Sequence, residues 1–139
     1  MIERVLVPMD ESELAEQALR FALEAYPSAE VTVLHVVGEP SAFLGKAAGI
    51  AIADDIEDAA EEHAATIFER AAEIADSYDA AVETAVALGH PGKAIVERSS
   101  EFDTVVMGSH GGSLSDRLFI GNVAERVFRR APVPVTTVR

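Results

Sequence analysis

Glycine, serine and histidine residues concentrate in one stretch of the chain, MGSHGGSLSDRLFIGN at residues 107–122. Glycines lack a Cβ atom and tolerate positive φ, so their backbone N–H groups can approach an anion closely. The start of a helix adds unpaired N–H groups and a partial positive charge. Gly108 and Gly111 follow an apolar run, and Gly121 with Asn122 opens a helical pattern. The stretch thus contains both parts of a phosphate-binding site, in the required order.

Ordinary structural roles account for the same residues equally well. Glycines form plain turns, and Asn122 with Glu125 three residues later fits a capping box that needs no ligand. His110 and Ser113 could donate hydrogen bonds to an anion or simply occupy an exposed loop. The local chemistry of this stretch does not decide between the two interpretations.

A second candidate residue, Asp10, follows the first apolar run of the chain. A carboxylate at the carboxyl end of a strand can accept hydrogen bonds from ribose hydroxyls, as in dinucleotide-binding folds. Asp10 also forms a capping-box pattern with Glu13 three residues later, which would need no ligand. We favour the ribose contact, and the two roles are compatible.

The apolar patterning predicts the elements that position these residues. Short, β-branched runs predict five strands, at residues 2–9, 31–37, 81–88, 104–107 and 133–138. Four helical patterns alternate with them. The first follows DES at residues 10–12, and the others run from residue 54 to 78, from the turn GHPG to residue 100, and over residues 122–130. Residues 38–53 read as a long loop, with room for a helical turn, that could act as a lid. This alternation predicts an α/β, Rossmann-like fold with an open, parallel, five-stranded sheet and helices on both faces.

In such sheets, ligands bind at the carboxyl ends of the strands, where the strand order reverses. The loops after the first and fourth strands are therefore the ones that should carry the site. They are also the loops richest in Asp, Ser and Gly.

Composition narrows the function classes. A net charge of −13 argues against nucleic acid and anionic membranes as partners, because phosphate backbones are bound mainly through Lys and Arg. The absence of cysteine excludes disulfides and thiolate chemistry. No run approaches the roughly 18 apolar residues of a membrane span, and the start lacks a signal-peptide pattern. We expect a soluble, cytoplasmic protein that forms one domain over residues 1–139, with an acidic surface like those of proteins from high-salt cytoplasm.

Enzymatic chemistry has little support in the sequence. There is no GK[ST] phosphate loop, no HxGH motif and no SGG-type loop after the first strand. The third strand ends in AVALGH, without the carboxylate that a phospho-receiver domain needs. No histidine pair has the spacing of a helical zinc site, and His35 reads as a hydrogen-bonded core residue. We predict no catalytic residue, no protein-bound metal and at most slow nucleotide hydrolysis.

The pattern Gly108-x2-Gly111-x9-Gly121-Asn122 resembles the G-x2-G-x9-G-[S/T] ATP-binding signature of the universal stress protein family. Four further segments extend the resemblance over nearly the whole chain: VLVPMDES, VLHVV, VVMGSHG and APVPVTTVR. The resemblance implies a sheet in the order 3-2-1-4-5 and a nucleotide that lies across strands one, two and four.

Matching positions imply a role for each residue of the site. Pro8 and Asp10 would border the ribose and adenine, and Val36 and Met107 would line the adenine pocket. The main chain would bind the phosphates at five positions, which are Gly108, Gly111, Gly121, Asn122 and Val123. The implied cofactor is ATP, to which Mg²⁺ could be bound.

The resemblance also implies a homodimer formed through the last strand, Val133 to Val138. Pro134 fits this, because a proline in a strand is tolerated at a sheet edge. Asn122 stands where the ATP-binding branch has Ser or Thr, so a family member that binds no nucleotide and acts as a dimeric scaffold is the alternative. The sequence does not identify the stress, the pathway or a protein partner.

Overall fold

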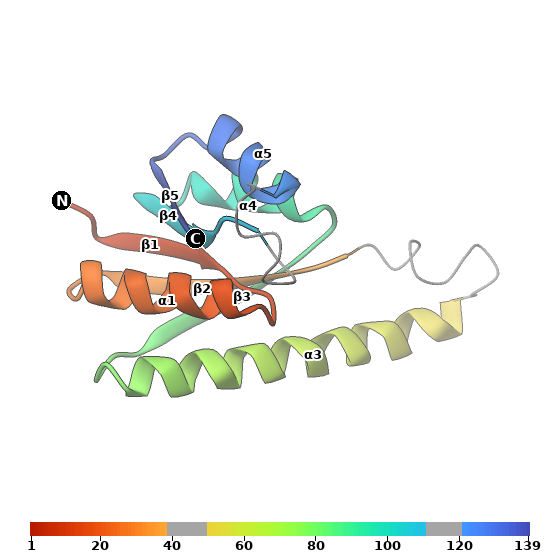
Figure 1. Ribbon diagram of the computed structural model, residues 1–139. Helices are drawn as coiled ribbons and strands as arrows, with labels where there is room; N and C mark the ends of the chain where they lie inside the picture. The colour runs from red at the N-terminus through yellow and green to blue at the C-terminus, as the bar shows by residue number, and fades with distance from the viewer. Residues whose placement is uncertain (39–49, 111–120) are drawn as a thin grey trace.

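The computed structural model describes residues 1–38, 50–110 and 121–139, and it forms a three-layered α/β arrangement (Figure 1). Along the chain the elements are β1 (Arg4–Pro8), α1 (Glu13–Ala25), β2 (Glu30–Val37), α3 (Ile50–Asp76), β3 (Val82–Leu88), α4 (Pro91–Ser99), β4 (Thr104–Gly108), α5 (Asn122–Arg130) and β5 (Val135–Val138).

All neighbouring strands are parallel, and the sheet has the order β3-β2-β1-β4-β5. The predicted fold class and strand order are therefore confirmed. From β1 the chain moves outward through β2 to β3, then returns to the other side of β1 for β4 and β5. The strand order reverses between β1 and β4, so the crevice at their carboxyl ends is the expected place for a ligand.

Both faces of the sheet are covered, with α1 and α3 on one face and α4 and α5 on the other (Figure 1). Alternate residues of β1 belong to different cores, since Val5 and Val7 pack with α1 and α3, whereas Leu6 packs with α4 and α5. All three side chains are fully buried. This explains why the central strands read as continuous apolar runs.

Several predicted boundaries differ from the structure by one to four residues, and two of these differences have a clear physical reason. The long helix begins at Ile50, not at Asp54, so the last four residues of the predicted 38–53 loop belong to α3. These residues read IAIA and have no polar face, so they show no helical period. The last strand begins at Val135, not at Val133, because Pro134 offers only its carbonyl, which accepts a hydrogen bond from the N–H of Val105 at 3.0 Å. The rest of the predicted loop, 39–49, lies outside the described residues.

Asp103 ties the amino-terminal ends of β1 and β4 together. Its Oδ2 accepts hydrogen bonds from the N–H groups of Glu3 at 2.8 Å and Arg4 at 2.9 Å. These two backbone donors hold the pKa of the Asp103 carboxyl below its ordinary value. This end of the sheet is opposite to the crevice, so its interactions serve the fold.

Among the described helices, none combines the length and the apolar character needed to cross a lipid bilayer.

Candidate functional site

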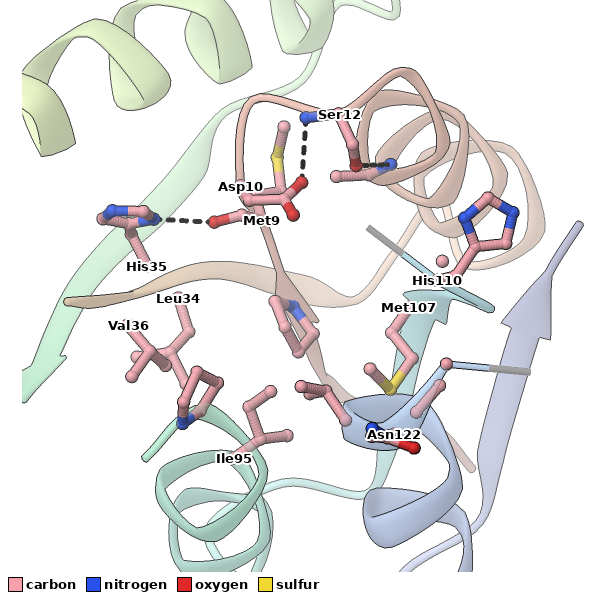
Figure 2. Close-up of a pocket in the computed structure, with 17 residues that line it drawn as sticks. Met9, Asp10, Ser12, Leu34, His35, Val36, Ile95, Met107, His110 and Asn122 are labelled. Carbon is pink, nitrogen blue, oxygen red and sulfur yellow. Dashed lines mark hydrogen bonds between the residues drawn. The ribbon is translucent and has the colours of Figure 1, made fainter. Parts of the chain in front are cut away.

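A cavity of about 600 Å³ opens at the point where the strand order reverses (Figure 2). The carboxyl ends of β1, β2 and β4 form its floor, and α1, α4 and α5 contribute their first turns. Its described lining residues are Pro8, Met9, Asp10, Ser12, Ala15, Leu34, His35, Val36, Pro91, Ile95, Met107, Gly108, His110, Gly121, Asn122, Val123 and Ala124.

Eight of the nine residues predicted for the nucleotide site line this one cavity. They are Pro8, Asp10, Val36, Met107, Gly108, Gly121, Asn122 and Val123. The ninth, Gly111, lies outside the described residues. Three segments far apart in the sequence are thus brought together around one space.

The corner between β1 and α1 is held by short hydrogen bonds. Oδ1 of Asp10 accepts from the N–H of Ser12 at 2.8 Å, and Oγ of Ser12 accepts from the N–H of Ala15 at 3.2 Å. Ser12 is therefore the N-cap of α1, and the predicted capping box of Asp10 with Glu13 is wrong. The helix begins at Glu13, so Asp10 lies two residues before the cap and its carboxylate borders the cavity (Figure 2).

His35 supports this corner from β2. The side chain is only 6% exposed, and its Nδ1 lies 2.9 Å from the carbonyl oxygen of Met9 (Figure 2). A carbonyl can only accept, so Nδ1 carries the proton and donates. His35 is thus the hydrogen-bonded core residue that was predicted, and it also lines the cavity.

One end of the cavity is apolar. Leu34 and Val36 of β2, Ile95 of α4 and Met107 of β4 face one another across it (Figure 2). Pro91 and Ile95 were not predicted, since α4 carries no binding motif. The signal that could have found them is topological, because the helix after β3 crosses over β2 beside the crevice. The apolar end suits a flat, aromatic ring.

At the other end, α5 points its amino terminus into the cavity. Gly121 is the N-cap, with φ −70° and ψ 162°, and has no side chain to accept from the first N–H groups. Asn122 is the first helical residue, so the predicted capping box of Asn122 with Glu125 is wrong. The amide of Asn122 borders the cavity instead (Figure 2). The first turn of α5 therefore offers the N–H groups and positive dipole end that bind anions.

Two glycines of the signature have packing roles of their own. A Cβ atom on Gly108 would lie 3.0 Å from Cβ of Leu14, and one on Gly121 would lie 3.1 Å from Cβ of His110. Neither glycine has its φ in the left-handed region. At both positions a Cβ atom would be closer than in an ordinary van der Waals contact, so close packing favours glycine independently of any ligand.

Charge in the cavity is low. Among its described lining residues, Asp10 is the only carboxylate and there is no Lys or Arg. The segment 111–120, outside the described residues, carries one Asp and one Arg. An anion held here would therefore depend on backbone N–H groups more than on cationic side chains.

Comparison with known proteins gives consistent matches over the whole chain. The model of the universal stress protein family matches residues 1–139. The universal stress protein MJ0577 of Methanocaldococcus jannaschii is 28% identical, over 100% of this chain and 96% of its own length. The solved structure of MJ0577 superposes with a TM-score of 0.82, at 26% identity over 99% of this chain and 96% of that one.

Two solved structures of similar fold are described as nucleotide complexes. A universal stress protein in complex with cAMP has a TM-score of 0.73 at 23% identity, over 99% of this chain and 97% of that one. The universal stress protein from Archaeoglobus fulgidus in complex with dAMP has a TM-score of 0.66 at 24% identity, over 100% of this chain and 98% of that one. At these identities the likeness shows the fold.

Proposed function

The chain belongs to the universal stress protein family, and on that premise we propose that it binds ATP in the cavity between β1, β4 and α5. The observation that carries the proposal is the assembly of eight sequence-predicted residues around one cavity at the reversal of strand order. Its size, apolar lining and few polar groups are typical of small-molecule sites.

The adenine ring would occupy the apolar end. Val36 and Met107 would contact it from the strands, and Ile95 would cover it from α4. The ribose would lie next to Asp10, whose Oδ1 is used by the turn to Ser12. Within the described residues Oδ2 accepts no hydrogen bond, so it is the oxygen that would accept from a ribose hydroxyl.

The phosphates would lie at the amino terminus of α5. The N–H groups of Asn122 and Val123 belong to its first turn, and Gly121 leaves them uncapped by a side chain. The amide nitrogen of Asn122 can donate to a phosphate oxygen, as the hydroxyl of Ser or Thr would. The complexes of similar proteins with cAMP and dAMP support adenine nucleotides as the ligand class. The preference for the triphosphate rests on the glycine signature.

We expect at most slow hydrolysis. Among the described lining residues, the candidate bases are Asp10 and the imidazoles of His35 and His110. Asp10 lies at the proposed ribose end, and Nδ1 of His35 donates to the carbonyl of Met9. His110, next to Gly121, is the described imidazole at the proposed phosphate end, and the described lining offers no carboxylate there.

We further propose that the protein forms a homodimer through β5. This strand is at the edge of the sheet and its four side chains are half-buried. An unpaired edge presents backbone donors and acceptors to a second copy.

The alternative is a dimeric scaffold that binds no nucleotide. The close packing around Gly108 and Gly121 supports this alternative, because packing favours glycine at both positions even when no ligand binds.

Calorimetric titration with ATP, with and without Mg²⁺, separates the two functions. We expect saturable binding of ATP, weaker binding of ADP and AMP, and no binding of GTP. An absence of heat at millimolar ATP would remove the nucleotide proposal and leave the scaffold. Chromatography of the same samples after several hours measures hydrolysis, and turnover at the rate of a dedicated ATPase would contradict a binding protein.

A further inference from the structure

We propose that His35 is the positioning residue of the nucleotide site, because it fixes the peptide unit that carries Asp10. The inference deepens the proposed function and rests on it where it concerns ribose recognition. The geometric part, that His35 holds the β1–α1 corner, stands on contacts of the protein itself.

The β1–β2 ladder ends just before the site. Its last pair is Pro8 with Leu34, and the N–H of Met9 still donates to the carbonyl of Leu34 at 2.8 Å. Beyond this point the chain turns away toward α1. The carbonyl of Met9 is thus left without a backbone donor from β2, although Met9 is only 4% exposed. A buried carbonyl needs a donor, and the side chain of His35 supplies it at 2.9 Å.

The hydrogen bond from His35 to the carbonyl of Met9 also fixes the orientation of the next residue, Asp10. The carbonyl of Met9 and the N–H of Asp10 belong to one planar peptide unit, so fixing the first fixes the second. The orientation of this unit sets the direction in which Asp10 leaves the strand. Asp10 is exposed and its own contact, with the N–H of Ser12 two residues on, is local. Among the described residues, the only hydrogen bond from the Met9–Asp10 peptide unit to the sheet is therefore the one that His35 donates.

The imidazole ring is itself held in place. His63 of α3 packs edge-on against it, with ring centroids 5.4 Å apart. On the same side, a smaller hollow is lined by Asp10, Glu11, Ser12, Glu13 and His63. His35 lines the main cavity and its ring contacts His63, which lines the smaller hollow, so the buried imidazole packs between β2 and α3.

Two substitutions separate the hydrogen bond from the bulk of the ring. His35→Phe keeps an aromatic ring but removes the donor, whereas His35→Asn keeps an N–H at about the position of Nδ1. Ile74→Val is the matched control, since Ile74 is buried between α3 and the sheet but does not line the cavity. It reports what a modest loss of core packing does by itself.

The first measurement needs no nucleotide. Hydrogen exchange of the Ser12 amide, which donates to Asp10, reports the order of the corner. We expect H35F to exchange this amide about tenfold faster than the wild type, the effect of one lost hydrogen bond of ordinary strength. H35N and I74V should exchange it at nearly the wild-type rate. Equal protection in H35F and the wild type would overturn the positioning role, whatever the protein binds.

The second measurement tests the consequence for recognition, by comparing the affinities for ATP and for 2′,3′-dideoxy-ATP. The wild type should prefer ATP through the ribose hydroxyls, and H35F should lose most of this preference by binding ATP about tenfold more weakly. H35N should restore it. If H35F lost affinity equally for both nucleotides, His35 would have only a structural role. If the wild type binds neither nucleotide, the proposed function fails, and the Ser12 amide alone decides whether His35 holds the corner.

Discussion

Gly108 at the end of β4 lies so close to α1 that a Cβ atom added to it would be 3.0 Å from Cβ of Leu14 and 3.3 Å from its backbone carbonyl carbon. Leu14 is in the first turn of α1 and is 3% exposed, so it cannot move aside without moving the helix. One glycine of the signature is thus required by the contact between a strand and a helix. This contact also places the first turn of α1 beside the cavity.

Gly108→Ala should therefore destabilise the fold by about 1–3 kcal/mol, the usual effect of overpacking a core. Gly92→Ala is the matched control, because its Cβ would meet Cδ of Arg126 at 2.8 Å. That atom belongs to a long side chain that can shift, so the loss should be much smaller. Urea unfolding of both variants measures whether G108A loses more stability than G92A. A G108A protein as stable as the wild type would refute the packing argument.

Asn122 offers a test in which stability and binding change in opposite directions. As the first residue of α5 without a capping role, it should accept aspartate, whose charge at a helix start is worth about 0.3–1 kcal/mol of stability. The same charge would face the proposed phosphates, so N122D should raise the melting temperature and weaken ATP binding more than tenfold. N122S, which restores a small donor, should retain binding. Unchanged ATP affinity in N122D would place the phosphates elsewhere.

The fold was largely predictable because the alternation of strands and helices was clear in the sequence. Val5, Leu6 and Val7 are all apolar because successive residues of β1 enter different cores. Such a run predicts a strand covered on both faces, and it does so without any tertiary information. The start of α3 was not predictable, since the apolar residues 50–53 have no polar face from which a period could be read.

The candidate site was predictable where a residue belongs to a motif on a strand end or helix start. Asp10 and Gly121 are of this kind. Pro91 and Ile95 are not, because the position of α4 over β2 follows from packing in three dimensions. The capping of α1 was misjudged because Asp10 and Ser12 are both good N-caps, and only the backbone shows that the helix begins at Glu13.

Stability should depend on pH through Asp103, whose pKa is lowered by the N–H groups of Glu3 and Arg4. The ionised carboxylate stabilises the folded state fully when the pH is above the unfolded pKa of Asp103, near 3.8. This stabilisation is lost as the pH falls through the lower pKa of the folded state. D103N, which has no charge to lose, should be less stable than the wild type at neutral pH. The difference should close toward about pH 2. Urea midpoints of both proteins measure it, and a gap that does not depend on pH would contradict the assignment.

Salt should stabilise the protein, because its net charge of −13 produces self-repulsion. Glu61, Glu62 and Glu69 are exposed acids on α3 for which the described residues provide no ion pair. Raising KCl from about 0.1 M to 1 M shortens the Debye length from roughly 10 Å to 3 Å, so the melting temperature should rise. In the triple variant E61Q/E62Q/E69Q the rise should be smaller. A wild-type melting temperature that salt leaves unchanged would exclude surface repulsion as a significant factor.

The proposed dimer can be tested through the direction in which backbone groups of β5 point. The carbonyls of Pro134 and Val138 accept hydrogen bonds from the N–H groups of β4 and the residue after it. Backbone groups alternate along a strand, so those of Thr136 also face β4, whereas those of Thr137 face the open edge.

Thr137→Pro should therefore block pairing with a second copy without removing a hydrogen bond to β4, and it should leave a folded monomer. Thr136→Pro removes a donor to β4 and should unfold at lower denaturant concentration. Light scattering and urea unfolding of the two variants measure these effects. A wild-type monomer would contradict the dimer altogether. If T137P stayed dimeric and F128E became monomeric, the interface would lie on α5, where Phe128 is 65% exposed, and not on the strand edge.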